Sequence, residues 1–132
     1  MKTTKIILVS LLFAVAGEGY SRPVDIETAR MVAQNFMGRA RGASNSVSDV
    51  VAERFEGQNS FYVVNFREGG WVMVSADDAT IPVLAYSYDD TYRLEDEKSG
   101  GFLFLTDGYK EEVDMLRKSG GRIRDGRYYL RV

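Results

Sequence analysis

The stretch of residues 61–88 constrains the fold of this 132-residue chain more than any other part of the sequence. Residues 61–66 (FYVVNF) and 71–75 (WVMVS) are rich in aromatic and β-branched side chains, a composition typical of strands. The four residues between them end in Gly69-Gly70, a connection of hairpin length. The sequence therefore predicts two antiparallel strands joined by a tight turn.

A third strand is predicted soon after this hairpin. Asp77-Asp78 indicates a polar corner, because aspartate side chains accept hydrogen bonds from nearby backbone amides. Pro82 then opens residues 83–88, at a position where a missing N–H group is tolerated. The three segments together predict an antiparallel sheet.

An amphipathic helix is predicted over residues 25–41. Asp25 suits the N-cap, because its carboxylate accepts a bond from a free first-turn amide, and Gly42 suits the left-handed stop. The helix should pack on the strand face that carries Tyr62, Val64 and Phe66. Its own apolar side chains recur at spacings of three and four: Ala29, Val32, Ala33, Phe36, Met37 and Ala40.

A second helix is predicted through Leu105, Tyr109, Val113 and Leu116, ending near Gly120-Gly121. Shorter signals predict a first strand at residues 50–55 with a turn at 57–59, a short strand at 91–94 and a terminal hairpin at 122–132. The pattern as a whole predicts an α+β fold, with an antiparallel sheet of about four strands, two α-helices and a C-terminal hairpin.

The first residues have the pattern of a secretory signal peptide. Lys2 and Lys5 precede an apolar run, and Ala14-Val15-Ala16 fits a small-residue cleavage site. The run is too short to span a bilayer, which takes about 20 residues. We therefore expect residues 1–16 to be removed and residues 17–132 to form one exported domain, periplasmic or extracellular, with no stable membrane anchor.

The composition excludes several kinds of chemistry. The sequence contains no cysteine and no histidine, which rules out disulfides, thiolate catalysis and histidine-based hydrolysis within the chain. The formal net charge of −2 argues against nucleic acid as a partner. Paired acids such as Asp77-Asp78, Asp89-Asp90 and Glu111-Glu112 are expected in turns and on exposed helix faces, since charged side chains are mostly exposed. We expect neither an enzyme nor a cofactor.

The hairpin and the residues after it carry a family resemblance. A strand ending in Phe66, a Gly-Gly turn, Trp71 followed by Val-Met-Val-Ser, then Asp77-Asp78, Pro82 and Leu-Ala-Tyr-Ser at residues 84–87 resemble the pro-domain of streptopain-like cysteine proteases. In those proteases a catalytic domain with a cysteine nucleophile and a histidine base follows the pro-domain. This chain has neither residue, so the resemblance implies a stand-alone, Spi-type protease inhibitor.

The resemblance also implies an architecture and a contact surface. It implies that both helices pack on one face of the sheet. It implies a noncovalent inhibitor that occludes the active-site cleft of a streptopain-like cysteine protease, using the segment before the second helix. The matching residues, which are the expected protease contacts, are Lys98, Ser99, Gly100, Gly101 and Phe102. Family members can carry Asn or Pro in this stretch, so a side-chain plug does not transfer directly to this chain.

Two other functions fit the same sequence. A pro-domain-like protein supplied in trans could assist the folding or secretion of its protease. Alternatively, the chain could be a generic exported binding module that uses exposed aromatic platforms, with Tyr86, Tyr88, Tyr92, Tyr128 and Tyr129 as the candidates.

Overall fold

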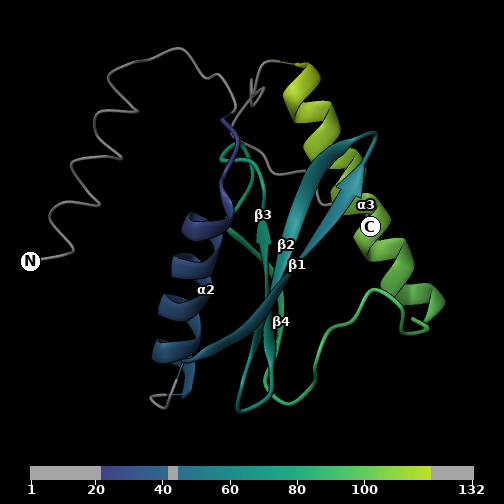
Figure 1. Cartoon of the computed structure of the whole chain (residues 1–132). Helices are drawn as coiled ribbons and strands as arrows, with labels where there is room; N and C mark the ends of the chain where they lie inside the picture. The colour runs from purple at the N-terminus through teal and green to yellow at the C-terminus, as the bar shows by residue number, and fades with distance from the viewer. Residues whose placement is uncertain (1–21, 42–44, 120–132) are drawn as a thin grey trace, which may run out of the picture.

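The computed structural model describes residues 22–41 and 45–119. Figure 1 shows a central sheet with one helix on either side of it. In chain order the elements are α2 (Ile26–Arg41), β1 (Val47–Phe55), β2 (Gln58–Phe66), β3 (Trp71–Ser75), β4 (Val83–Ser87) and α3 (Gly100–Lys118). The strands lie in the order β1-β2-β3-β4, and all neighbours are antiparallel. The predicted α+β fold with a four-stranded antiparallel sheet and two helices is confirmed.

The predicted hairpin of β2 and β3 is confirmed, with Val63 opposite Met73, although β2 begins at Gln58 rather than at residue 61. Gly70 has a φ of 89°, and a Cβ atom placed there would lie 2.7 Å from the carbonyl oxygen of Ser87. Any other residue would clash with the backbone of β4, so the close approach requires glycine. The Gly70 amide also donates to the carbonyl of Asp90 at 2.8 Å, which fixes the chain that leaves β4.

The first strand is longer than predicted, because β1 begins at Val47 rather than at residue 50. The turn after it is Glu56-Gly57, with φ values of 50° and 79°, rather than residues 57–59. Two consecutive positive φ values match the right-handed twist of a two-residue hairpin. Gln58 is therefore already paired, opposite Phe55.

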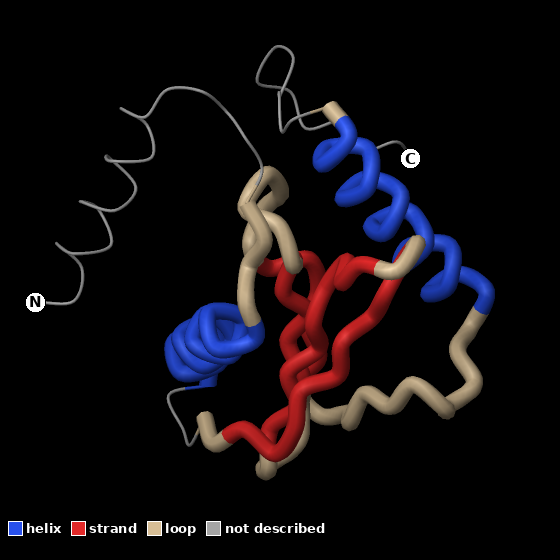
Figure 2. Tube along the Cα trace, turned by 45° about the horizontal axis from the view of Figure 1, so that its top comes forward, coloured by secondary structure: helices blue, strands red, loops and turns tan. Residues whose placement is uncertain are grey.

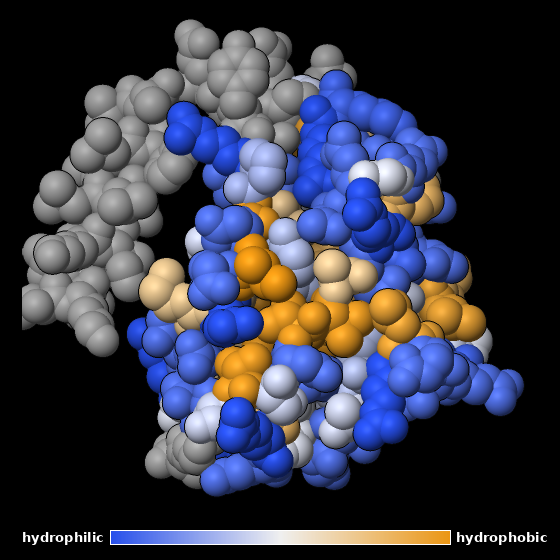
Figure 3. Space-filling model, in the orientation of Figure 1, coloured by the Kyte–Doolittle hydropathy of each residue, from blue (hydrophilic) through white to orange (hydrophobic). Residues whose placement is uncertain are grey.

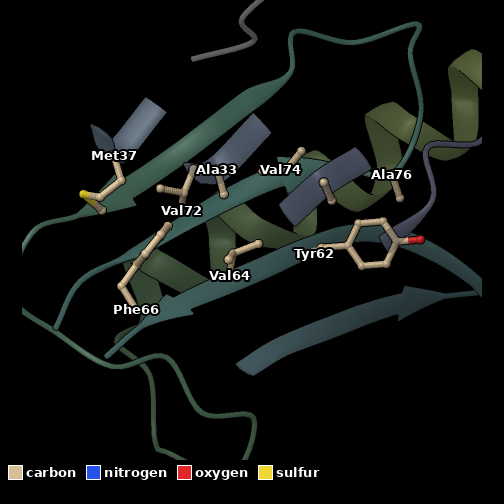
Figure 4. Close-up of a cluster of buried hydrophobic side chains, with 9 residues drawn as sticks. Ala33, Met37, Tyr62, Val64, Phe66, Val72, Val74 and Ala76 are labelled. Carbon is tan, nitrogen blue, oxygen red and sulfur yellow. The ribbon is translucent and has the colours of Figure 1, made fainter. Parts of the chain in front are cut away.

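The helix α2 covers the face of the sheet that the sequence predicts. Tyr62 and Val64 of β2 lie under Ala33 and Met37 of α2 in one buried cluster, which Figure 4 shows in close-up. Asp25 is the N-cap, accepting a bond from the Thr28 amide at 2.7 Å. The apolar face of the helix and the apolar face of the strands, each predicted separately from the sequence, pack against each other in this cluster.

The helix α3 packs on the opposite face, so the expectation of both helices on one face is wrong. Figures 1 and 2 show the sheet between the two helices. The physical reason is that β2 and β3 are apolar on both faces, and both faces must be covered. The second cluster contains Phe61, Val63, Trp71, Met73 and Tyr92, with Phe102 and Tyr109 of α3 packed against it.

Two further details differ from the sequence prediction. Residues 91–94 form no strand, and α3 begins at Gly100, before the apolar pattern that predicted it. Leu105 is exposed, while Thr106 is buried. The inward face therefore follows Phe102, Thr106, Tyr109 and Val113, and Leu105 lies beside it.

Several predicted features lie outside the described residues: the signal peptide at residues 1–16, the stop at Gly42, the end of the second helix at Gly120-Gly121 and the hairpin at 122–132. Within residues 22–41 and 45–119, no helix is both long and apolar enough to cross a membrane.

Candidate functional site

The predicted contact segment, Lys98 to Phe102, lies where a long loop meets the beginning of α3 (Figure 2). Ser99 is the N-cap of the helix, because its Oγ accepts a bond from the Phe102 amide at 3.2 Å. Gly100 and Gly101 form the first turn and are exposed. The segment is therefore the ordered end of a helix rather than a free loop.

Lys98 is engaged within the loop itself. Its Nζ donates to the carbonyl oxygens of Arg93 at 2.6 Å, Asp96 at 3.0 Å and Leu94 at 3.3 Å. The same ammonium group lies 4.8 Å from the centre of the Tyr92 ring, at cation–π distance. Lys98 thus closes the turn at residues 93–96, just before α3 begins.

Phe102 is also engaged, in the core. Its ring lies 6.3 Å from the ring of Trp71 and 6.0 Å from that of Tyr92, centre to centre. Trp71 and Tyr92 are themselves in edge-to-face contact at 5.7 Å. Trp71 is a core residue, and Phe102 attaches α3 to the sheet.

Tyr92 holds the loop before α3 through contacts of several kinds. Its backbone N–H donates to Oδ1 of Asn65 and its carbonyl accepts from Nδ2 of Asn65, both at 2.8 Å. Its hydroxyl donates to Glu53 at 2.7 Å, and the other oxygen of Glu53 lies 3.2 Å from the Lys110 ammonium. Burial, followed by the contact with Glu53, raises the pKa of the Tyr92 hydroxyl far above its usual range.

The roles of Asn65 and Tyr92 are missing from the sequence prediction. One signal for Asn65 is visible in the sequence, because it is the single amide in the apolar run of residues 61–66. Asn65 is fully buried, and a buried amide must find partners. No sequence signal identifies Tyr92 as the partner, 27 residues later.

The acidic pairs do not converge into a site. The carboxylate of Asp77 accepts a bond from the Ala79 amide and pairs with Arg117 Nε at 3.1 Å. The neighbouring carboxylate of Asp78 instead accepts a bond from the Arg22 amide. Burial raises the pKa of Glu112. Among the described residues there is no group of three or more acidic side chains placed to hold a metal ion.

The candidate aromatic platforms fall into separate places. Tyr86 and Tyr88 are half-exposed, and Tyr86 also contacts Phe36, but neighbouring rings are tilted by 44° and 50° rather than coplanar. Tyr92 is buried in the core on the α3 side of the sheet. Tyr128 and Tyr129 lie outside the described residues. The described tyrosines therefore form no common flat surface.

The site geometry thus consists of a helix end with two exposed glycines, held by buried contacts on its inner side. Comparison with curated proteins and with solved structures gives no match. The family model described as Spi protease inhibitor matches residues 21–113, which include α2, all four strands and most of α3. The match covers well over half of the chain, so this protein belongs to the Spi protease inhibitor family.

Proposed function

We propose that this chain is an exported inhibitor of a streptopain-like cysteine protease, which it binds noncovalently so that the active-site cleft is occluded. Membership in a family of protease inhibitors carries the proposal. The choice of a streptopain-like target rests on the resemblance of the β2–β3 hairpin and the segment after it to the pro-domains of those enzymes.

Inhibition by covering an active-site cleft has physical requirements that this chain can meet. An inhibitor of this kind supplies a preorganised surface and no reactive group, and a standard protease–inhibitor interface takes about 800 Å² from each partner. Preorganisation matters because each loop or side chain ordered on binding reduces affinity. The contacts of Tyr92 and Lys98 already fix the loop that leads to the exposed end of α3.

Export is part of the proposal. The lysines and the apolar run before Ala16 support a signal peptide that is removed to leave residues 17–132. N-terminal sequencing of the exported chain tests this point, with Gly17 as the expected first residue.

An inhibition assay tests the function. The chain without residues 1–16 is titrated against a mature streptopain-like cysteine protease, with a trypsin-like serine protease as the control enzyme. We expect reversible, competitive inhibition of the cysteine protease alone, with activity restored on dilution. No inhibition at equimolar or higher concentrations would refute the proposal. An increased refolding yield of the protease without inhibition of the mature enzyme would favour the folding-partner alternative.

A further inference from the structure

Phe104 occupies an unusual position on α3. It lies about half a helical turn away from Phe102 and Thr106, the side chains that face the sheet. The residue is 77% exposed, the largest exposed fraction of any large apolar residue in the described part of the chain. The fold therefore gives this aromatic ring no packing role, and exposed apolar groups that gather on a surface mark interaction sites.

The neighbours of Phe104 on the helix surface are mostly bare backbone. The positions three and four residues away are Gly100, Gly101, Asp107 and Gly108. A Cβ atom added to any of these glycines would meet nothing within 4 Å, and none of the three has a positive φ. Glycine destabilises a helix relative to alanine. Neither packing nor backbone geometry requires these glycines, whereas close approach by a partner would.

Further exposed apolar and acidic residues lie close to Phe104 in the sequence, on α3 and in the loop that leads to it. Leu94 is 55% exposed and Leu103 45% exposed. Lys98 holds the turn at residues 93–96, just before α3, so that its charge is directed at carbonyl oxygens. The exposed charged groups of this region are Arg93 and four acids: Glu95, Asp96, Glu97 and Asp107.

We propose that this surface, the α3 tip, is the main contact with the protease, and that Phe104 is its anchor. The α3 tip comprises Leu94, Leu103 and Phe104, the three glycines beside Phe104, and the acidic border of Glu95, Asp96, Glu97 and Asp107. Figure 3 shows apolar side chains at the surface where α3 begins. The inference rests on the proposed function and specifies which residues perform it.

The chemistry of the α3 tip defines the partner surface. A single aromatic anchor within a ring of less important contacts is the usual arrangement of an interface hot spot. The acidic border requires basic side chains on the partner, because complementary charges steer association and like charges oppose it. We therefore expect the protease to offer an apolar depression bordered by basic residues. Phe102, which packs against Trp71 and Tyr92, is not free to serve as the anchor.

The first experiment compares inhibition constants. Phe104→Ala should weaken inhibition about 30-fold or more, as expected for a hot-spot residue. Met115→Ala is the matched control, since Met115 is also apolar, 62% exposed and on the outer side of the same helix, and it should leave inhibition unchanged. Gly108→Leu should preserve or raise the melting temperature, because leucine favours helix, and yet weaken inhibition by blocking close approach. A purely structural role could not produce these opposite changes.

The second experiment tests the acidic border. The triple variant Glu95→Gln, Asp96→Asn and Glu97→Gln should lower the association rate constant and reduce its dependence on salt. Glu68→Gln, in the exposed turn between β2 and β3, is the control and should leave both unchanged. Circular dichroism verifies the fold of every variant.

The outcomes separate this inference from the proposed function. If the parent chain inhibits and folded Phe104→Ala and Gly108→Leu inhibit equally well, the α3 tip is not the contact, although the inhibitor function stands. If the parent chain does not inhibit, both proposals fail. If Phe104→Ala converts a dimer into a monomer in sedimentation without changing inhibition, the surface serves a second copy of the chain and the inference is overturned.

Discussion

At the scale of single residues, the pair of Asp77 and Arg117 joins two parts of the chain. The Asp77 side chain is 1% exposed and follows β3, while Arg117 lies in the last turn of α3 and also donates to the Ala76 carbonyl at 3.2 Å. The sequence predicts that Asp77 shapes a corner, and it does so through the Ala79 amide. The partner 40 residues away could not be predicted, because it depends on which face α3 covers.

We predict that Arg117→Met destabilises the protein by about 3 kcal/mol, since it leaves the Asp77 carboxylate buried without its counter-charge. Lys118→Met is the control. Lys118 pairs with Asp114 at 2.7 Å, but its side chain is 66% exposed, and exposed pairs contribute little to stability because water and salt screen them. Urea denaturation measures both. Equal effects of the two substitutions would show that burial of Asp77 is not what makes its partner important.

At the scale of elements, the N-cap of α2 gives a pH-dependent contribution. The Asp25 carboxylate accepts a bond from the Thr28 amide, and backbone bonding, chiefly from Thr28, lowers its pKa. A group whose pKa is lowered by folding stabilises the native state above its unfolded pKa. That contribution is lost as the pH falls through the folded pKa.

We therefore predict that Asp25→Ala lowers the melting temperature at pH 7, and that the difference from the parent shrinks as the pH falls below about 4. Asp25→Asn should retain part of the stability at pH 7, because an amide oxygen still caps the helix, and should remove the pH dependence. Calorimetry between pH 3 and pH 7 checks this. A difference that stays constant over this range would exclude the carboxylate charge as the cause.

The predicted helices and strands agree with the structure to different degrees. Period-two and period-3.6 patterns predicted β2, β3 and α2 closely, because those patterns follow from burial on one face. They predicted the α3 face less well, because Thr106 is buried and Leu105 is not. A polar residue can take an inward position beside an apolar one, and only the packed structure decides between them. The sequence predicted that residues 98–102 lead into the second helix, but the internal packing of Phe102 depends on Trp71 and Tyr92, both distant in sequence.

At the scale of the whole molecule, two cores share one sheet. Side chains of β2 and β3 alternate between the cluster under α2 and the cluster under α3. Loss of either helix would expose apolar side chains of the same two strands. We therefore expect the two cores to unfold together.

Two matched substitutions, one in each cluster, test whether the two cores unfold together. Met37 and Met73 are both fully buried, one in each cluster, so Met37→Ala and Met73→Ala should each cost about 2–5 kcal/mol. Trp71, the single tryptophan, lies in the cluster under α3, so its fluorescence reports that face. For each variant, fluorescence and circular dichroism should give coincident transitions. A Met37→Ala protein whose fluorescence transition stays at the parent midpoint would show two independent cores.

The strand order has a consequence for how quickly this protein gains its structure. Each strand pairs with the strand next to it in the chain, so sheet formation needs only short loop closures. Such closures cost little chain entropy, and local pairings are associated with fast folding. The sheet can therefore form as soon as residues 47–87 are available, before α3 is in place. For a chain that we propose is exported, this order of events limits the time during which its strands are exposed to aggregation.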